Sequence, residues 1–232
     1  MPERAVTEMD GGASAGAAGD PPGWFGKLSA LGDFASRRLP ADWVQLCDQW
    51  LARSIQASRE RLGVNWQDLY LSSPIWRFAW APGVADRRWW FGVLMPSCDK
   101  VGRYFPLLIA QGRDSPPQDR ASLDHLEAWW RHLAGSAMLT LEDHGGIEDF
   151  EVALAAAPAW PAHQIQVRPA NNTQPPTLPD WTGHWAADLM RDRLLGCSLW
   201  WPLAEGGAAT SVTLSHGLPA PDRFADLLSW RR

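Results

Sequence analysis

Residues 95–107, MPSCDKVGRYFPL, decide the fold together with the apolar run on either side of them. The run before them, residues 88–94, reads RWWFGVL, and the run after them, residues 104–110, reads YFPLLIA. Short aromatic and branched runs of this kind, bounded by polar turn residues, are typical of buried strands. The turn chemistry between the runs comes from Pro96, Ser97, Asp99, Lys100 and Gly102. We therefore predict a buried hairpin with a loop of moderate length, which presents charged side chains.

The composition is that of a globular protein with an unusual number of tryptophans. Of the 232 residues, 46% are hydrophobic and 20% are charged, so the chain can bury a sizeable core. A net charge of -5 argues against nucleic acid as a partner, because phosphate binding needs a basic surface. The 16 tryptophans are spread along the chain, which favours core packing over a single aromatic ligand groove.

Cysteine spacing and hydropathy exclude several further classes of protein. Cys47, Cys98 and Cys197 are far apart and odd in number, which fits reduced thiols in a cytosolic protein better than a disulfide framework or a zinc site. No apolar run reaches the length of a membrane-spanning helix, so we expect no membrane insertion. Residues 1–22 are rich in Gly and Ala and are predicted to be a flexible tail, followed by one domain over residues 23–232.

Upstream of the hairpin, the sequence predicts a strand, a long helix and a second strand. Residues 24–28 are expected to form a first strand at the edge of the sheet. Apolar positions from residue 43 onward cover half of a helix that starts after Pro40 and stops at Gly63. Residues 65–71 form a short connection, and residues 73–80 read as a strand. Trp76, Phe78 and Trp80 share one face of that strand.

Downstream of the hairpin, helical patterns alternate with breakers. Ser122 is expected to cap a helix that ends near Gly135, and residues 137–141 and 150–157 suggest two short helices. Residues 159–179 are rich in proline and are predicted to be a long loop, with a brief strand at 164–167, before a weakly helical stretch at 181–195. Residues 197–202 and 210–214 suggest a second hairpin, and residues 222–228 a closing helix.

Together these elements predict the fold class. We expect one α/β domain with a mixed, largely antiparallel central sheet of about five or six strands, covered by helices.

Four charged residues near the hairpin form the candidate site. Arg77 lies between apolar neighbours on a predicted strand, and a buried arginine needs an acidic partner, for which Asp33 and Asp99 are the candidates. With Arg103 these residues are expected to converge beside the hairpin. The cluster either locks the fold or forms part of a surface for a partner.

No catalytic, cofactor-binding or metal-binding motif is found in the sequence. Ser97 or Cys98 could serve a small hydrolase, but no nucleophile elbow is present and no motif assigns a partner histidine. His125 and His132 share a helix face two turns apart, which is not the spacing of a zinc site. Glycine-rich phosphate-binding motifs are likewise absent from the sequence. The residues alone therefore favour a binding or regulatory domain without enzymatic activity, cofactor or metal.

Six short motifs, in this order and spacing, resemble the TagF/ImpM family of type VI secretion-associated proteins. They are WFGKL (24–28), GDF (32–34), RLP (38–40), SPIWRF (73–78), GVLMPS (92–97) and VGRYFPL (101–107). The resemblance is close over residues 24–111, similar in character to about residue 157, and looser over residues 158–232.

The resemblance implies a bacterial cytoplasmic accessory protein that represses the secretion system after translation. In that family, repression is linked to binding the forkhead-associated (FHA) scaffold protein of the system. The family supplies no catalytic residues to transfer to this chain. Two other readings stay open at this point, a small hydrolase that uses Ser97 or Cys98 and a structural subunit of the apparatus.

Overall fold

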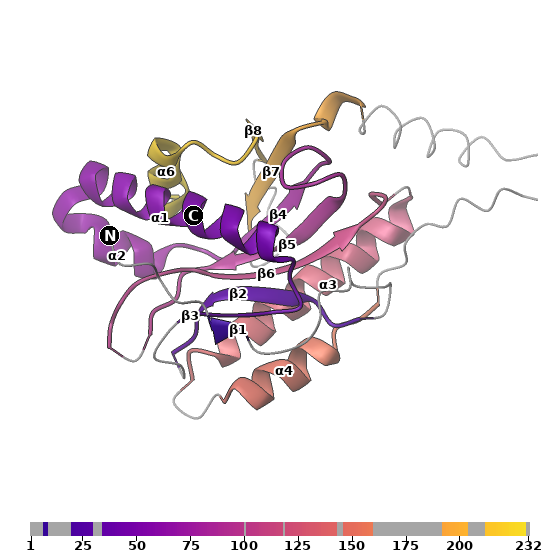
Figure 1. The fold of residues 1–232 in the computed structure, drawn as a ribbon, viewed down its shortest axis with the longest axis horizontal. Coiled ribbons are helices and arrows are strands. Elements are labelled where there is room, and N and C mark those ends of the chain that lie inside the picture. The colour runs from indigo at the N-terminus through magenta and orange to yellow at the C-terminus, as the bar shows by residue number, and fades with distance from the viewer. Residues whose placement is uncertain are drawn as a thin grey trace, which may run out of the picture.

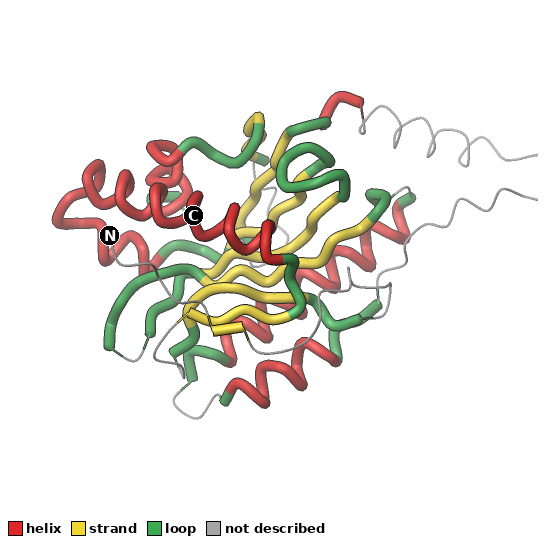
Figure 2. Tube along the Cα trace, in the orientation of Figure 1, coloured by secondary structure: helices red, strands yellow, loops and turns green. Residues whose placement is uncertain are grey.

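A central sheet of eight strands organises the molecule, with helices on both faces (Figures 1 and 2). The computed structural model describes residues 7–8, 20–29, 34–99, 101–117, 119–142, 146–159, 192–203 and 212–230. Within these ranges, no helix has both the length and the apolar character needed to cross a membrane.

The sheet runs in the order β1-β3-β2-β6-β5-β4-β7-β8. Its strands are β1 (Thr7–Glu8), β2 (Gly23–Lys27), β3 (Phe34–Arg37), β4 (Trp76–Trp80), β5 (Trp89–Met95), β6 (Leu107–Arg113), β7 (Cys197–Pro202) and β8 (Thr213–His216). All neighbours are antiparallel except β1 and β3, which are parallel. The predicted fold class, a mixed and largely antiparallel sheet covered by helices, is confirmed. The expected number of strands was too low.

The predicted central hairpin is formed by β5 and β6. The two strands pair from Trp89 opposite Arg113 to Met95 opposite Leu107. Beyond Met95 the chain continues to pair, because Phe105 donates its N–H to the carbonyl of Ser97. β6 begins three residues later than expected, after Pro106, which has no N–H to donate to a ladder.

The prediction that residues 24–28 form an edge strand is wrong. β2 lies inside the sheet, between β3 and β6, and it is buried along its whole length. Two strands that the sequence did not predict, β3 and β1, lie outside it. β1 falls within residues 1–22, so the division of the chain at residue 22 stays a prediction.

Helix α1 (Ala41–Leu62) forms as predicted and covers one face of the sheet. Gly63 ends it with a φ of 54°, a left-handed conformation that glycine adopts without a steric penalty. Trp43 and Trp50 of α1 pack on Trp80 of β4, with ring centroids 5.4 and 6.5 Å away. The short helices η1 (Gly63–Asn65), α2 (Trp66–Ser72), η3 (Pro221–Arg223) and α6 (Phe224–Leu228) complete this layer.

Helices α3 (Arg120–Leu139) and α4 (Ile147–Ala155) cover the opposite face. Two details of the α3 prediction are wrong. The cap is Asp119, whose side chain accepts the N–H of Ser122 at 2.7 Å, so Ser122 lies inside the first turn. The helix also continues through Gly135 to Leu139 and absorbs the start of the short helix expected at 137–141.

Helix α4 is fastened to the sheet by a carboxylate. Glu151 accepts hydrogen bonds from the indole of Trp24 at 2.6 Å and from the guanidinium of Arg38 at 2.6 Å. Phe150 packs edge-on against the Trp24 ring, with the centroids 5.6 Å apart. The middle of α4 is therefore held close to the start of β2, and a small pocket lies between the end of α4 and the residues that precede β2.

The C-terminal part adds β7 and β8 to the free side of β4. This second hairpin was predicted, and the final helical turn at α6 was as well. The proline-rich stretch at 159–179, its brief strand and most of the helix expected at 181–195 lie outside the described residues. Most tryptophans that the structure describes are buried, which confirms that they pack the core.

Candidate functional site

The loop that closes the β5–β6 hairpin, residues 96–106, is held by Tyr70 of α2. The Tyr70 hydroxyl donates to the Ser97 carbonyl at 2.9 Å and accepts the Ser97 N–H at 3.0 Å. Burial raises the pKa of Tyr70 well above its usual value, so this hydroxyl keeps its proton. The Ser97 hydroxyl donates to the carbonyl of Lys27 at 2.8 Å and thereby joins the loop to β2.

Replacing Tyr70 with phenylalanine is expected to lower the free energy of unfolding by about 1–3 kcal/mol. The substitution leaves the N–H of Ser97 buried without an acceptor, while the Ser97 carbonyl keeps the N–H of Phe105 and loses only its second donor. Urea denaturation measures the change, with Tyr104→Phe in the same ring cluster as the matched control. Equal stability of Tyr70→Phe and the wild type would contradict this role.

Asp99 is buried, and its carboxylate binds the charged groups next to the loop. Its side chain has no exposed surface, and it forms an ion pair with Lys27, which is also buried. Arg103 donates Nε to the same carboxylate at 2.6 Å. The other carboxylate oxygen accepts the N–H of Val101 at 3.1 Å and the N–H of Arg103 at 2.8 Å. Burial alone would raise the pKa of Asp99, but the hydrogen bonds from Lys27 and Arg103 outweigh it and hold the pKa well below its usual value.

The structure brings together two of the four residues of the predicted cluster. Asp99 and Arg103 are in contact, and Asp33 lies outside the described residues. Arg77 is paired with Glu127 of α3, with Nη1 2.6 Å from Oε1. The expectation that Asp99 is its partner is wrong, because the Asp99 carboxylate pairs with Lys27 and Arg103, and the expectation for Asp33 falls outside the described residues.

Arg77 does not reach Asp99 because successive side chains along a strand point to opposite faces of the sheet. Arg77 shares a face of β4 with Ala79, which packs in the α3 and α4 layer. Lys27, the partner of Asp99, lies over the ring of Phe34, which packs in the α1 layer. Sequence reasoning missed Lys27 and Glu127. A lysine inside the apolar run WFGKL was the available signal, because a buried ammonium needs a carboxylate.

Ser97 and Cys98 lie in a closed turn. Ser97 is buried, and its hydroxyl is engaged by the Lys27 carbonyl. Cys98 is half-buried and forms an isolated bridge with Tyr104. Within the ranges that the structure describes, neither side chain is hydrogen-bonded to a histidine. A serine or cysteine nucleophile is ordinarily activated by a base within hydrogen-bond reach, and the Ser97 hydroxyl instead donates to a backbone carbonyl.

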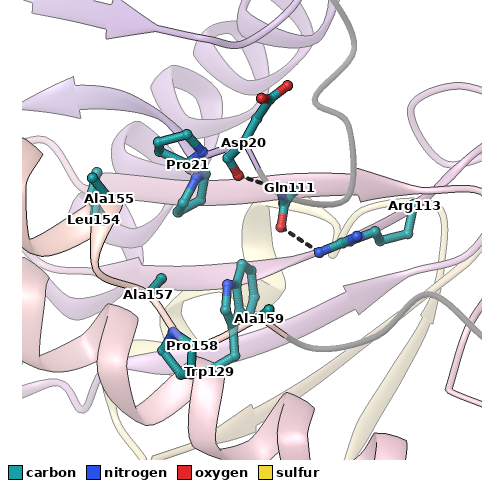
Figure 3. A pocket seen from close by; sticks show the side chains of 11 residues that line it. Asp20, Pro21, Gln111, Arg113, Trp129, Leu154, Ala155, Ala157, Pro158 and Ala159 are labelled. Atoms are coloured by element: carbon teal, nitrogen blue, oxygen red, sulfur yellow. Dashed lines mark hydrogen bonds between the residues drawn. The ribbon is translucent and has the colours of Figure 1, made fainter.

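A pocket lies where the end of β6 meets α3 and the end of α4 (Figure 3). Gln111 and Arg113, two residues apart on β6, project from the same face of the strand. Gln111 donates to the carbonyl of Asp20 at 2.9 Å, and Arg113 donates to the Gln111 side-chain oxygen at 3.0 Å. The other walls come from Pro21, Pro22, Trp129, Leu154, Ala155, Ala157, Pro158 and Ala159. Sequence reasoning missed this pocket, because its walls come from four separate parts of the chain.

Comparison with known proteins assigns the chain to a family. A family model described as the TagF N-terminal domain, type VI secretion system-associated, matches residues 23–157. The chain belongs to the TagF family. It is therefore a type VI secretion system-associated protein, as the six motifs indicated.

The TagF fold is also found in a solved structure. This TagF chain is similar to the protein PA0076 of Pseudomonas aeruginosa PAO1, whose crystal structure was determined at 2.05 Å resolution. The two are 36% identical, the match covers 90% of this chain and 94% of that chain, and the TM-score is 0.73. The search of curated proteins gave no match.

Proposed function

We propose that this TagF protein is a non-enzymatic, post-translational repressor of a bacterial type VI secretion system. It acts in the cytoplasm by binding the FHA scaffold protein of the system. The observation that carries the proposal is the match of residues 23–157 to a family associated with this apparatus. Repression and the scaffold partner are what the resemblance of the six motifs implies.

The hairpin loop supports a role in protein binding. Val101 is 72% exposed, and the side chain of Arg103 is 58% exposed. Both residues lie on a loop whose backbone is fixed by Asp99 and Tyr70, so little further conformational freedom is lost when a partner binds. Exposed arginines on a rigid support are frequent anchors of protein interfaces.

The burial of Asp99 divides the roles within the loop. Asp99 has no exposed surface with which to touch a partner, so it positions the loop. Arg103 and Val101 are the residues that make contact. The sequence-based hypothesis left two roles open for the charged cluster. We assign the locking of the fold to Asp99 and the binding of the partner to Arg103.

Replacing Arg103 with alanine is expected to weaken capture of the FHA scaffold protein at least about tenfold, which corresponds to 1.4 kcal/mol. The measurement is a quantitative pull-down with purified scaffold protein. Arg131→Ala is the matched control, because its side chain is 61% exposed and also pairs with an acid four residues away, but it lies on α3. Its capture should equal that of the wild type.

Three results would contradict parts of the proposal. Equal capture by Arg103→Ala and the wild type would exclude the loop as the contact surface. Failure of the wild type to capture the scaffold would exclude this partner. A deletion strain whose secretion is no higher than that of its parent would exclude repression.

A further inference from the structure

Strand β8 forms one edge of the central sheet (Figure 1). Within the part of the chain that the structure describes, β8 pairs with β7 alone. The opposite edge is β1, which has two residues, whereas β8 has four. An edge strand directs a row of backbone N–H and C=O groups away from its sheet, and another strand can bind to them. β8 is therefore the longer of the two edges at which this sheet can be extended.

The hydrogen bonds of β7 show which backbone groups of β8 point outward. Ala81, directly after β4, donates its N–H to the carbonyl of Cys197 at 2.9 Å, so the backbone groups of Cys197 are directed toward β4. This direction alternates along a strand, so the groups of Ser198 are directed toward β8, where Ser215 lies opposite. By the same alternation, the N–H and C=O of Leu214 are directed away from β7, as are those of the residues two positions before and after it.

The side chains of residues 212–216, VTLSH, are complementary to a second copy of themselves. The stretch contains no Asp, Glu, Lys or Arg. Val212 and Leu214 share one face of the strand and are 54% and 58% exposed, and the hydroxyl residues Thr213 and Ser215 alternate with them. In an antiparallel pair about a twofold axis at Leu214, leucine lies opposite leucine and Thr213 lies opposite Ser215 of the second copy. Threonine and serine hydrogen-bond across strands, and no like charges are brought together.

β8 also lacks the features that keep edge strands from pairing. Such strands are commonly protected by lysine, by proline or by a bulge. Residues 212–216 contain no lysine or proline, and the register of β8 on β7 is regular from Thr213 to His216. Leu199 of β7 lies opposite Leu214 and is half-buried, so the apolar surface continues from the edge onto the hairpin. A second copy would join this surface to its own.

We propose that two copies of this chain associate through β8, as an antiparallel pair about a twofold axis at Leu214, so that the two sheets become one continuous sheet. Leu214 exchanges backbone hydrogen bonds with Leu214 of the second copy, and Val212 does so with His216. The interface is small, so the dimer is weak, with a dissociation constant in the micromolar range. This inference does not depend on the proposed function, because the hairpin loop that is assigned to the scaffold takes no part in it.

Sedimentation velocity of the full chain, measured from low to high micromolar concentration, tests the proposal. The wild type should convert from monomer to dimer over this range. Leu214→Lys should weaken the dimer at least about tenfold, because two ammonium groups meet at the twofold axis. Leu123→Lys is the matched control, because Leu123 is 51% exposed but lies on α3. This control should dimerise like the wild type.

A mixture of two variants tests the register of the strands. Leu214→Glu alone should also fail to dimerise, because two carboxylates then meet at the axis. An equimolar mixture of Leu214→Lys and Leu214→Glu should form a heterodimer, because the ammonium of one copy meets the carboxylate of the other. Since recovery of the dimer requires both variants to be folded, the mixture also separates a lost interface from a lost fold.

Several results would overturn the proposal. They are a wild type that stays monomeric throughout, a dimer that Leu214→Lys leaves unchanged, and variants that do not associate when mixed. Two further results would assign the edge to a different occupant. Slow hydrogen exchange of the Leu214 N–H in the dilute monomer would mean that another part of this chain pairs with β8. A monomeric wild type whose capture of the FHA scaffold falls with Leu214→Lys would mean that the scaffold pairs with β8.

Discussion

Replacing Asp99 with alanine is expected to lower the free energy of unfolding by about 3–5 kcal/mol. The reason is that the substitution leaves the ammonium of Lys27 buried without its carboxylate, and breaking a buried ion pair by removing one partner costs about this much. It also removes the acceptor of two backbone N–H groups in the loop. Urea denaturation of the variant and the wild type at neutral pH measures the loss.

The matched control for Asp99→Ala is a variant that removes the other cation bound to the Asp99 carboxylate. Arg103→Ala removes a cation whose side chain is 58% exposed, and exposed ion pairs contribute about 0–1 kcal/mol. A small loss for Arg103→Ala beside a large loss for Asp99→Ala is the expected pattern. Losses of similar size for the two variants would mean that the Lys27–Asp99 pair does not dominate the contribution of Asp99 to the free energy of unfolding.

The same pair predicts how stability depends on pH. The pKa of Asp99 is lowered in the folded state, whereas an unfolded aspartate titrates near about 3.9. The contribution of Asp99 is therefore complete above the unfolded pKa and is lost as the pH falls toward the folded pKa. Between about pH 5 and pH 2, the wild type should lose more stability than Asp99→Ala does. Parallel curves for the two proteins would exclude this source of acid sensitivity.

Replacing Gly92 with alanine is expected to cost at least about 3 kcal/mol of folding free energy. Gly92 lies in the middle of β5, opposite Phe78 of β4 and Ala110 of β6. A Cβ atom at this position would lie 2.5 Å from Phe78 Cζ and nearer still to the carbonyl oxygen of Ile109. The Phe78 ring cannot retreat, because it stacks on Trp80 with the ring centroids 4.6 Å apart.

A second glycine provides the control for this prediction. Gly135 lies inside α3, and a Cβ atom there would have no neighbour within 4 Å. Because alanine is the better helix former, Gly135→Ala should stabilise the protein by about 0.5–1 kcal/mol. Opposite signs for the two glycines, measured by thermal or urea denaturation, are the expected result. A loss below about 1 kcal/mol for Gly92→Ala would mean that β4 and β6 move apart at little cost.

Local patterns in the sequence were sufficient to predict the elements that each depend on one stretch of chain. The β5–β6 hairpin follows from two apolar runs around a turn, and α1 follows from an apolar face that ends at Gly63. The shared face of Trp76, Phe78 and Trp80 follows from the two-residue period of a strand, and all three side chains pack in one core layer.

Features that depend on contacts between distant parts of the chain could not be predicted in this way. The interior position of β2 is decided by its pairing with β6, some 80 residues later. Arg77 pairs with Glu127 because α3 covers the face of the sheet from which Arg77 projects. No spacing in the sequence specifies which helix covers that face. Of the predicted site, only the contact between Asp99 and Arg103 is local, four residues apart, and it is the part that the structure brings together.

The pairing of β4 with β7 has a consequence for how the chain emerges from the ribosome. Trp80 of β4 pairs with Ser198 of β7, about 120 residues later. At a synthesis rate of about 5–20 residues per second, β7 is made about 6–24 seconds after β4. During that interval one side of a tryptophan-rich strand has open backbone groups, which are a template for pairing with other nascent chains. A chaperone that covers β4 until β7 is made would reduce such mispairing, whereas slower synthesis would prolong the exposure.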